Sequence, residues 1–292
     1  RDGRFFPLVV DTAWMAFADA TLEDWGAYLD TRKGQGFTAV AVSVLPIPHD
    51  RVVRTGSREP YARTAVGSYK VGRPEERYWR TAERMSQMVI DRGLELVLVL
   101  LWCNYVEGSW AARLTPWTVM SEDDRRAHIE RSVATLGHHK PILLVSGDDH
   151  FDNEDTVSVY GEVLEQVGRI APNLLTSMHS SADADLPESI ASSPHLDFYS
   201  YQSGHHLHQQ RGAFEIADLY FKKRVRNPLR NIEPRYEGMG YSHDSNVGRY
   251  SSSDVRCATW WSITAGAGAG FGYGAHGVWQ WHDREGQFAA LG

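Results

Sequence analysis

Two carboxylates each follow directly on a short apolar run. Asp148 comes after PILLVSG (141–147), and Glu233 ends NPLRNIE (227–233). Two carboxyl groups that flank one bond can carry out glycoside hydrolysis, because one protonates the departing oxygen while the other attacks the anomeric carbon or activates a water. A crowded, apolar site can raise the pKa of the acid so that it keeps its proton near neutrality. This chemistry requires a fold that brings the two residues face to face.

Short apolar runs alternate with segments of helical period along the whole chain. Most of the runs are almost continuously apolar, as parallel strands covered on both faces are. The eight predicted strands are FFPLVV (5–10), FTAVAVSVL (37–45), LELVLVLLW (94–102), PILLVSG (141–147), NLLTSM (173–178), LDFYSYQ (196–202), NPLRNIE (227–233) and GAGFGYG (268–274). The main predicted helices cover 21–36, 76–93, 121–137, 153–172, 212–224 and 252–266.

Eight strands separated by helices fit either a (β/α)8 barrel or a doubly wound open sheet. Eight units of near-equal length favour the barrel, so we predict an α/β fold of the TIM-barrel type with residues 1–292 as one catalytic domain. The long connection 46–74 follows a strand and is expected at the catalytic mouth. After the last strand only GVWQWHDREGQFAALG (277–292) remains, so we expect an incomplete or missing eighth helix, with a further C-terminal segment or a subunit covering that side.

In such a barrel the carboxyl ends of the strands meet in one pocket. Strands four and seven, which carry Asp148 and Glu233, lie roughly opposite each other across it. Strand ends also deliver indoles, imidazoles and further polar groups, which suit the apolar faces and hydroxyls of a sugar. The predicted substrate-binding residues are Asp11, Trp14, Trp102, Asn104, Asp149, His179, Gln202, His205, Tyr236, His276 and Trp279.

Structural roles for the two carboxylates stay open at this point. Asp148 and Asp149 could cap a helix that begins near Asn153, and Glu233 could pair with Arg230 or Arg235. The aromatic mouth could also bind a saccharide without cleaving it.

A metal-dependent hydrolase is a further alternative. GHHLH (204–208), together with His150, His179 or His276, could supply the three ligands that a catalytic zinc needs. The pattern is not HExxH, and no cysteine pair supports it. We therefore expect neither a metal nor a cofactor.

The stretch AGAGAGFGYG (265–274) repeats glycine at alternate positions. Its spacing differs from the dinucleotide-binding G-x-G-x-x-G, and no lysine follows as in a Walker motif. Because a strand alternates its faces, we interpret the run as a strand with one bare face, which a helix or a substrate could approach closely. Its end would carry His276 and Trp279 to the pocket.

Composition narrows the partners. The formal charge of −7 and the lack of a long basic run argue against nucleic acid and anionic membranes as partners. The aromatic and polar residues at the strand ends favour a saccharide as the substrate. The longest apolar run, 94–102, is too short to span a bilayer as a helix. The chain begins with Arg1 and shows no signal peptide, so the sequence leaves secretion open.

For Cys103 and Cys257, two buried free thiols are favoured over a disulfide.

Five segments occur in register with one known family. VVDTAW (9–14), SGDD (146–149), FYSYQSGHH (198–206), NIEPRYEG (231–238) and DVRCATWWSITAGAGAGFGYGAHGVWQW (254–281) together resemble the apiosidase-like glycoside hydrolases of family 140. The resemblance implies a (β/α)8 barrel that hydrolyses a pentofuranosyl linkage, to apiose or an arabinofuranose-like sugar, with retention of configuration. It also implies that Asp148 is the general acid/base and Glu233 the nucleophile, the same two residues that the strand ends single out.

Overall fold

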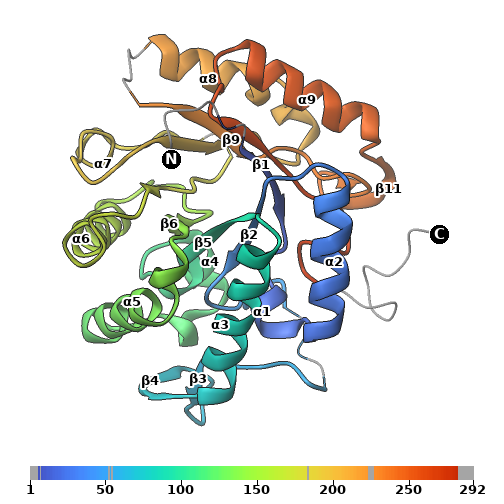
Figure 1. Cartoon of the computed structure of the whole chain (residues 1–292). Coiled ribbons are helices and arrows are strands. Elements are labelled where there is room, and N and C mark those ends of the chain that lie inside the picture. Colours follow the sequence, from blue (N-terminus) through green and yellow to red (C-terminus); the bar gives the residue numbers. More distant parts are fainter. Residues whose placement is uncertain are drawn as a thin grey trace.

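Eight parallel strands curl into a nearly closed barrel in the computed structural model, which describes residues 6, 8–51, 53, 55–182, 184–222 and 227–281 (Figure 1). Neighbours in the sheet follow the order β7-β6-β5-β2-β1-β12-β9-β8, so the first strand pairs with the last. That closure confirms the barrel over an open, doubly wound sheet. The strands are β1 (Leu8–Thr12), β2 (Ala39–Ser43), β5 (Glu95–Trp102), β6 (Ile142–Gly147), β7 (Thr176–Ser177), β8 (Tyr199–Gln202), β9 (Leu229–Glu233) and β12 (Gly270–Tyr273).

The seam between β7 and β8 closes the barrel without a backbone ladder. Side chains supply much of the contact there. Ser177 Oγ donates to the carbonyl of Phe198 at 2.8 Å and lies 2.9 Å from Ser200 Oγ. The backbone N–H of Asp197 adds one bond to the carbonyl of Thr176 at 3.1 Å.

The six predicted helices are confirmed, and several surround the barrel on its outside (Figure 1). They are α2 (Leu22–Gly34), α3 (Glu76–Asp91), α5 (Glu122–Leu136), α6 (Glu154–Ile170), α8 (Gly212–Lys222) and α9 (Ser252–Thr264). Hydroxyl caps begin three of them: Thr21, Ser121 and Ser251 each accept a backbone N–H three residues ahead.

Short elements fill the connections and escape prediction because they are too short to show a period. They are the helices α1 (Ala16–Asp19), α4 (Trp110–Leu114) and α7 (Glu188–Ala191), and the 3-10 turns η1 (Cys103–Tyr105), η2 (Pro116–Thr118), η3 (Gly137–His139) and η4 (Leu207–Gln209). Two antiparallel hairpins lie in the long loops after β2 and β9. They are formed by β3 (Tyr61–Arg63) with β4 (Tyr69–Pro74), and by β10 (Gly240–Tyr241) with β11 (Asp244–Arg249).

The glycine run contains β12, but the groups that cover its face without side chains are not the predicted helix or substrate. A Cβ on Gly272 would lie 1.7 Å from the carbonyl oxygen of Ile232, and one on Gly270 would lie 2.1 Å from that of Leu8. A Cβ on Gly274 would lie 2.2 Å from the ring of Tyr236. The neighbouring strands and a tyrosine ring therefore take this space, and the expectation of a helix or substrate there is wrong for these three positions.

Three further expectations can be compared with the structure. Cys103 is buried and Cys257 is exposed, and both are free thiols, so the disulfide alternative is wrong and only one of the two is buried as expected. Within the described residues, no helix is long and apolar enough to cross a membrane. The predicted gap at the eighth helix concerns residues 282–292, which lie outside the described residues.

Candidate active site

A cavity of about 720 Å³ opens at the carboxyl ends of the barrel strands, and both Asp148 and Glu233 line it. The barrel thus brings together two acids that are far apart in the sequence. Seven of the predicted substrate-binding residues share the lining: Trp14, Trp102, Gln202, His205, Tyr236, His276 and Trp279.

The other four predicted residues lie behind the cavity wall. Asp11 faces α2, where its carboxylate accepts hydrogen bonds from Tyr28 Oη at 2.6 Å and from Arg32 Nε. Alternation along β1 directs this side chain out of the barrel, so the expectation that Asp11 lies in the pocket is wrong. The side chain of Asp149 is bound within its own loop, where its Oδ1 accepts a hydrogen bond from the backbone N–H of Phe151 at 2.7 Å.

Asn104 and His179 are fully buried and support residues that do reach the cavity. Asn104 Oδ1 lies 3.0 Å from Nδ1 of His49, a cavity residue. His179 stacks on Trp14, with ring centroids 5.5 Å apart, and meets the edge of Trp102 at 5.6 Å. Both residues are therefore placed as supports rather than as contacts for a ligand.

Glu233 is held by two imidazoles. His205 Nε2 donates to Oε1 at 2.9 Å, and His179 Nε2 lies 3.1 Å from Oε2. Burial alone would raise the pKa of Glu233, but these two contacts outweigh it and lower the pKa to about 2. Glu233 is consequently ionised throughout the ordinary pH range.

Neither arginine considered as a partner for Glu233 binds it. Arg235 donates to the carbonyl of Gln210 at 2.7 Å, and Arg230 Nε donates to Ser200 Oγ at 3.0 Å. The ion-pair alternative for Glu233 is therefore wrong.

Removing the imidazole of His205 should raise the pKa of Glu233. In His205→Phe, the ring contact with Tyr236 can persist while the hydrogen bond to Glu233 is lost. Burial raises the pKa of Glu233, and in this variant only one imidazole still lowers it. We therefore expect the acid limb of kcat/KM against pH to move up by at least about one pH unit. His205→Gln, which keeps an N–H donor, should move it less. An acid limb that stays in place in His205→Phe would contradict this assignment.

Asp148 follows β6 in the left-handed backbone region, with φ at 54°. Ser181 Oγ donates a hydrogen bond to Asp148 Oδ1 at 2.9 Å. The side-chain amide nitrogen of Gln202, in the orientation of the amide that satisfies its hydrogen-bond partners, donates to the same oxygen at 2.8 Å. Trp110 Nε1 holds the backbone carbonyl of Asp148 at 2.7 Å. With both side-chain donors on Oδ1, the other oxygen of the carboxyl group is left to carry a proton.

The pKa of Asp148 is raised to about 7, first by burial and then by the negative charge of Glu233. The helix-cap alternative is wrong for this residue, because Asn153 caps α6 by accepting the N–H of Thr156 at 2.9 Å. One buried carboxyl group is thus protonated near neutrality while its partner is ionised. Such a separation of pKa values assigns acid and base roles to paired carboxyl groups.

Several cavity residues were not predicted from the sequence. Ser181 and Trp110 hold Asp148, and His243 reaches the lining from the β10–β11 hairpin. His49 lies on the long loop that was expected at the mouth, but nothing in the loop sequence distinguished it from its neighbours. The loop expectation is confirmed, since His49 and Asp50 line the cavity.

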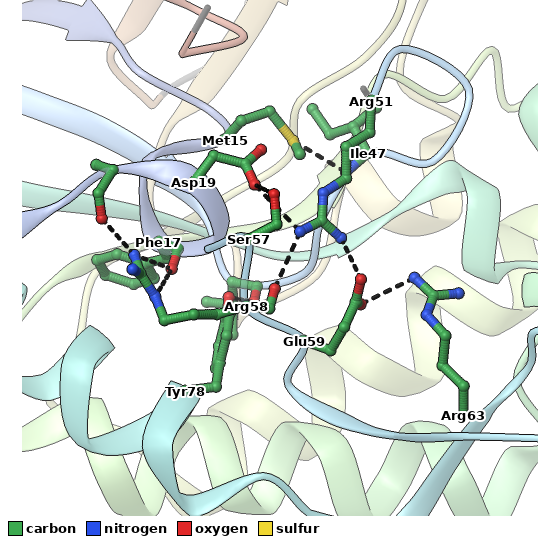
Figure 2. A network of polar contacts seen from close by, with 12 residues as sticks. Met15, Phe17, Asp19, Ile47, Arg51, Ser57, Arg58, Glu59, Arg63 and Tyr78 are labelled. Carbon is green, nitrogen blue, oxygen red and sulfur yellow. Dashed lines mark hydrogen bonds and ion pairs between the residues drawn. The ribbon is translucent and has the colours of Figure 1, made fainter. Parts of the chain in front are cut away.

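A buried ion network fixes this loop to α1 (Figure 2). Arg51, whose side chain is 2% exposed, lies 3.1 Å from Asp19 Oδ1 and 2.6 Å from Glu59 Oε1. Ser57 Oγ donates to Asp19 at 2.6 Å, so the carboxylate joins two parts of the loop. Since Arg51 is two residues from His49, the network holds that imidazole at the cavity.

Replacing Arg51 with methionine should loosen the loop and leave Asp19 buried without its cation. We expect the free energy of unfolding to fall by about 3 kcal/mol, and KM to rise by a larger factor than kcat falls. Chemical denaturation and steady-state kinetics measure the two effects. Arg63→Met is the control, because the contacts it removes, with Glu59 at 2.8 Å, the carbonyl of Gly67 at 2.7 Å and Tyr69 Oη at 3.2 Å, belong to a partly exposed side chain. It should cost less than about 1 kcal/mol. Equal losses in the two variants would contradict the anchoring role.

Among the described residues, the histidines considered for a zinc site belong to no group of three ligands within reach of one ion. His205 binds Glu233, while His206 and His208 stack with ring centroids 5.4 Å apart. In the part of the chain that the structure describes, the one group of three metal-ligating side chains within reach of a common ion lies elsewhere, on α3 and η3.

Comparisons with known proteins agree with the barrel fold. A glycoside hydrolase family 5 structure from Bacteroides vulgatus superposes with a TM-score of 0.78 at 20% identity, covering 98% of this chain and 62% of that one. An endo-1,4-beta-mannanase from Rhizomucor miehei gives 0.65 at 11% identity, covering 94% and 87%. At these identities the likeness shows the barrel fold, and this chain spans less than two thirds of the first structure's length.

The comparison with curated proteins gave no match. A family model described as the apiosidase-like catalytic domain matches residues 1–290, nearly the whole chain. The chain therefore belongs to the family of apiosidase-like catalytic domains.

Proposed function

We propose that the chain is the catalytic domain of a retaining glycoside hydrolase that cleaves a pentofuranosyl linkage, as in the apiosidases of family 140. That it is a glycosidase follows from its family. The observation that carries the catalytic assignment is the pair of buried carboxyl groups in one cavity, with pKa values of about 7 for Asp148 and about 2 for Glu233. The pentofuranosyl linkage and the retention of configuration are proposed from the resemblance to family 140.

The proposed reaction takes two steps. Glu233 attacks the anomeric carbon while Asp148 gives its proton to the departing oxygen, so the glycosidic bond breaks and a glycosyl ester forms. Asp148, now ionised, then takes a proton from a water molecule. The oxygen of that water attacks the anomeric carbon, which releases the sugar and frees the carboxylate of Glu233. Two inversions at one carbon give net retention.

Aromatic groups of the cavity suit a saccharide. The indole N–H groups of Trp102 and Trp279 are buried and have no hydrogen-bond partner among the described residues. The indole of Trp14 is fixed instead, since its N–H donates to Tyr236 Oη at 2.9 Å. Two free donors on apolar rings can bind sugar hydroxyls while the ring faces cover the sugar. These donors support a saccharide as the substrate.

A panel of nitrophenyl glycosides tests the proposal. It should include apiofuranoside, arabinofuranoside and, as a control, xylopyranoside. We expect turnover of a furanoside and little of the pyranoside, with the first-formed product retaining its anomeric configuration by NMR. Product of inverted configuration would exclude the two-step route. Saccharide binding with no released sugar from any substrate would support the non-catalytic barrel instead.

A further inference from the structure

A second polar cluster lies on the outer shell of the barrel, formed by Glu83 of α3 with His138 and His139 of η3. None of the three lines the catalytic cavity. The rings of the two histidines are 3.9 Å apart, tilted by 40°. Each imidazole places its Nε2 3.6 Å from the same carboxylate oxygen, Glu83 Oε1. Three ligand atoms therefore converge from two elements that are far apart in the sequence.

The two distances from Glu83 are close to those between ligands of a shared ion, and all three ligand atoms lie within 4.8 Å of one another. At 3.6 Å the N···O separations exceed the range of about 2.7–3.2 Å for a direct hydrogen bond. Zinc binds imidazole nitrogen and carboxylate oxygen at about 2.0–2.2 Å, which puts neighbouring ligands of a tetrahedral site roughly 3.4 Å apart. A small movement of either side chain would complete the geometry.

His139 gives a second and independent indication. Its side chain is 2% exposed, and its Nε2, the atom that faces Glu83, has no hydrogen-bond partner among the described residues. A buried nitrogen without a hydrogen-bond partner lowers the stability of the fold unless a ligand or an ion binds it.

We propose that Glu83, His138 and His139 bind a divalent transition-metal ion, with zinc as the best fit to two imidazoles and one carboxylate. Water would complete the coordination on the exposed side, where Glu83 and His138 reach solvent. The ion would join α3 to the turn that ends α5. Its role is structural, because the cluster is separate from the cavity that holds Asp148 and Glu233.

Titration calorimetry with zinc chloride tests the site on the full chain, produced without a histidine tag and dialysed against a chelator. We expect one saturable site in the wild type, with a dissociation constant of about 10 µM or lower. Glu83→Gln and His138→Asn change partly exposed ligands and should each weaken binding by at least about tenfold. Glu130→Gln is the matched control, since it removes an exposed carboxylate of α5 that is outside the cluster.

Thermal unfolding provides a second readout. Zinc at about 100 times its dissociation constant should raise the midpoint of the wild type by roughly 4–8 °C, and the rise at the same zinc concentration should fall to about half or less in Glu83→Gln, while glycosidase activity is kept. Absence of saturable zinc binding by the wild type up to about 100 µM would overturn the proposal. Wild-type affinity in Glu83→Gln would also overturn it, because the zinc would then be bound by other residues.

Discussion

Glu233→Ala will lower kcat by a factor on the order of 10⁴, and azide will restore turnover with a glycosyl azide of inverted configuration as product. Without the carboxylate, no glycosyl ester can form, while Asp148 can still protonate the departing oxygen. The small azide anion can enter the space that the side chain leaves and attack the anomeric carbon once. The measurement is the rate on an activated aryl furanoside, with the configuration of the azide determined by NMR.

A neighbouring carboxylate provides the control for this result. Glu237, whose Oε2 accepts a hydrogen bond from Tyr273 Oη at 2.9 Å, does not line the cavity, so Glu237→Gln should keep activity within a few-fold of the wild type. Circular dichroism must show that Glu233→Ala is folded. If the folded variant keeps more than about a tenth of the wild-type kcat, Glu233 is not the nucleophile.

Asp148→Ala should abolish the alkaline limb of the pH profile. The active form of the wild type needs Glu233 ionised and Asp148 protonated. Because the pKa of Asp148 is about 7 and that of Glu233 about 2, kcat/KM should be high between them and fall as pH rises through 7. Without Asp148 that fall disappears. Rates on a substrate with a poor leaving group should drop by a factor on the order of 10³, whereas a dinitrophenyl leaving group needs no acid for the first step.

Asp152→Asn is the matched variant for this experiment, because Asp152 is an exposed carboxylate four residues along the same loop. It should keep the wild-type profile. The result that contradicts the assignment is an alkaline limb that persists near pH 7 in Asp148→Ala, since some other group would then supply the proton.

Much of the fold, and the location of the two acids at one cavity, could be predicted from the sequence. The strands are buried on both faces, so each reads as an apolar run, and the barrel rule then places the residue after each run at one mouth. Asp148 and Glu233 obey that rule because both side chains enter the cavity. Asp11 also follows an apolar run, yet it points outward to Arg32, because one residue of register decides which face of a strand a side chain takes.

The residues that were missed depend on contacts between distant segments. His49 and His243 arrive on loops whose course is set by the Arg51 network and by the β10–β11 hairpin, and neither has a periodic signal in the sequence. His179 was expected to contact the sugar, but its ring packs against two tryptophans and faces Glu233. A sequence indicates that an imidazole is near the mouth, while only packing decides whether it faces a ligand or a carboxylate.

The serine-lined seam between β7 and β8 makes catalysis more sensitive to heat than the fold of the barrel as a whole. His179 stands just after β7 and Glu233 ends β9, so their contact crosses the place where the backbone ladder is interrupted. Because β7 and β8 are not joined by a backbone ladder, the sheet can open locally at this seam while the remaining strands stay paired. Such an opening would separate Glu233 from one of its two imidazoles. On warming, turnover would then decline before the barrel as a whole melts.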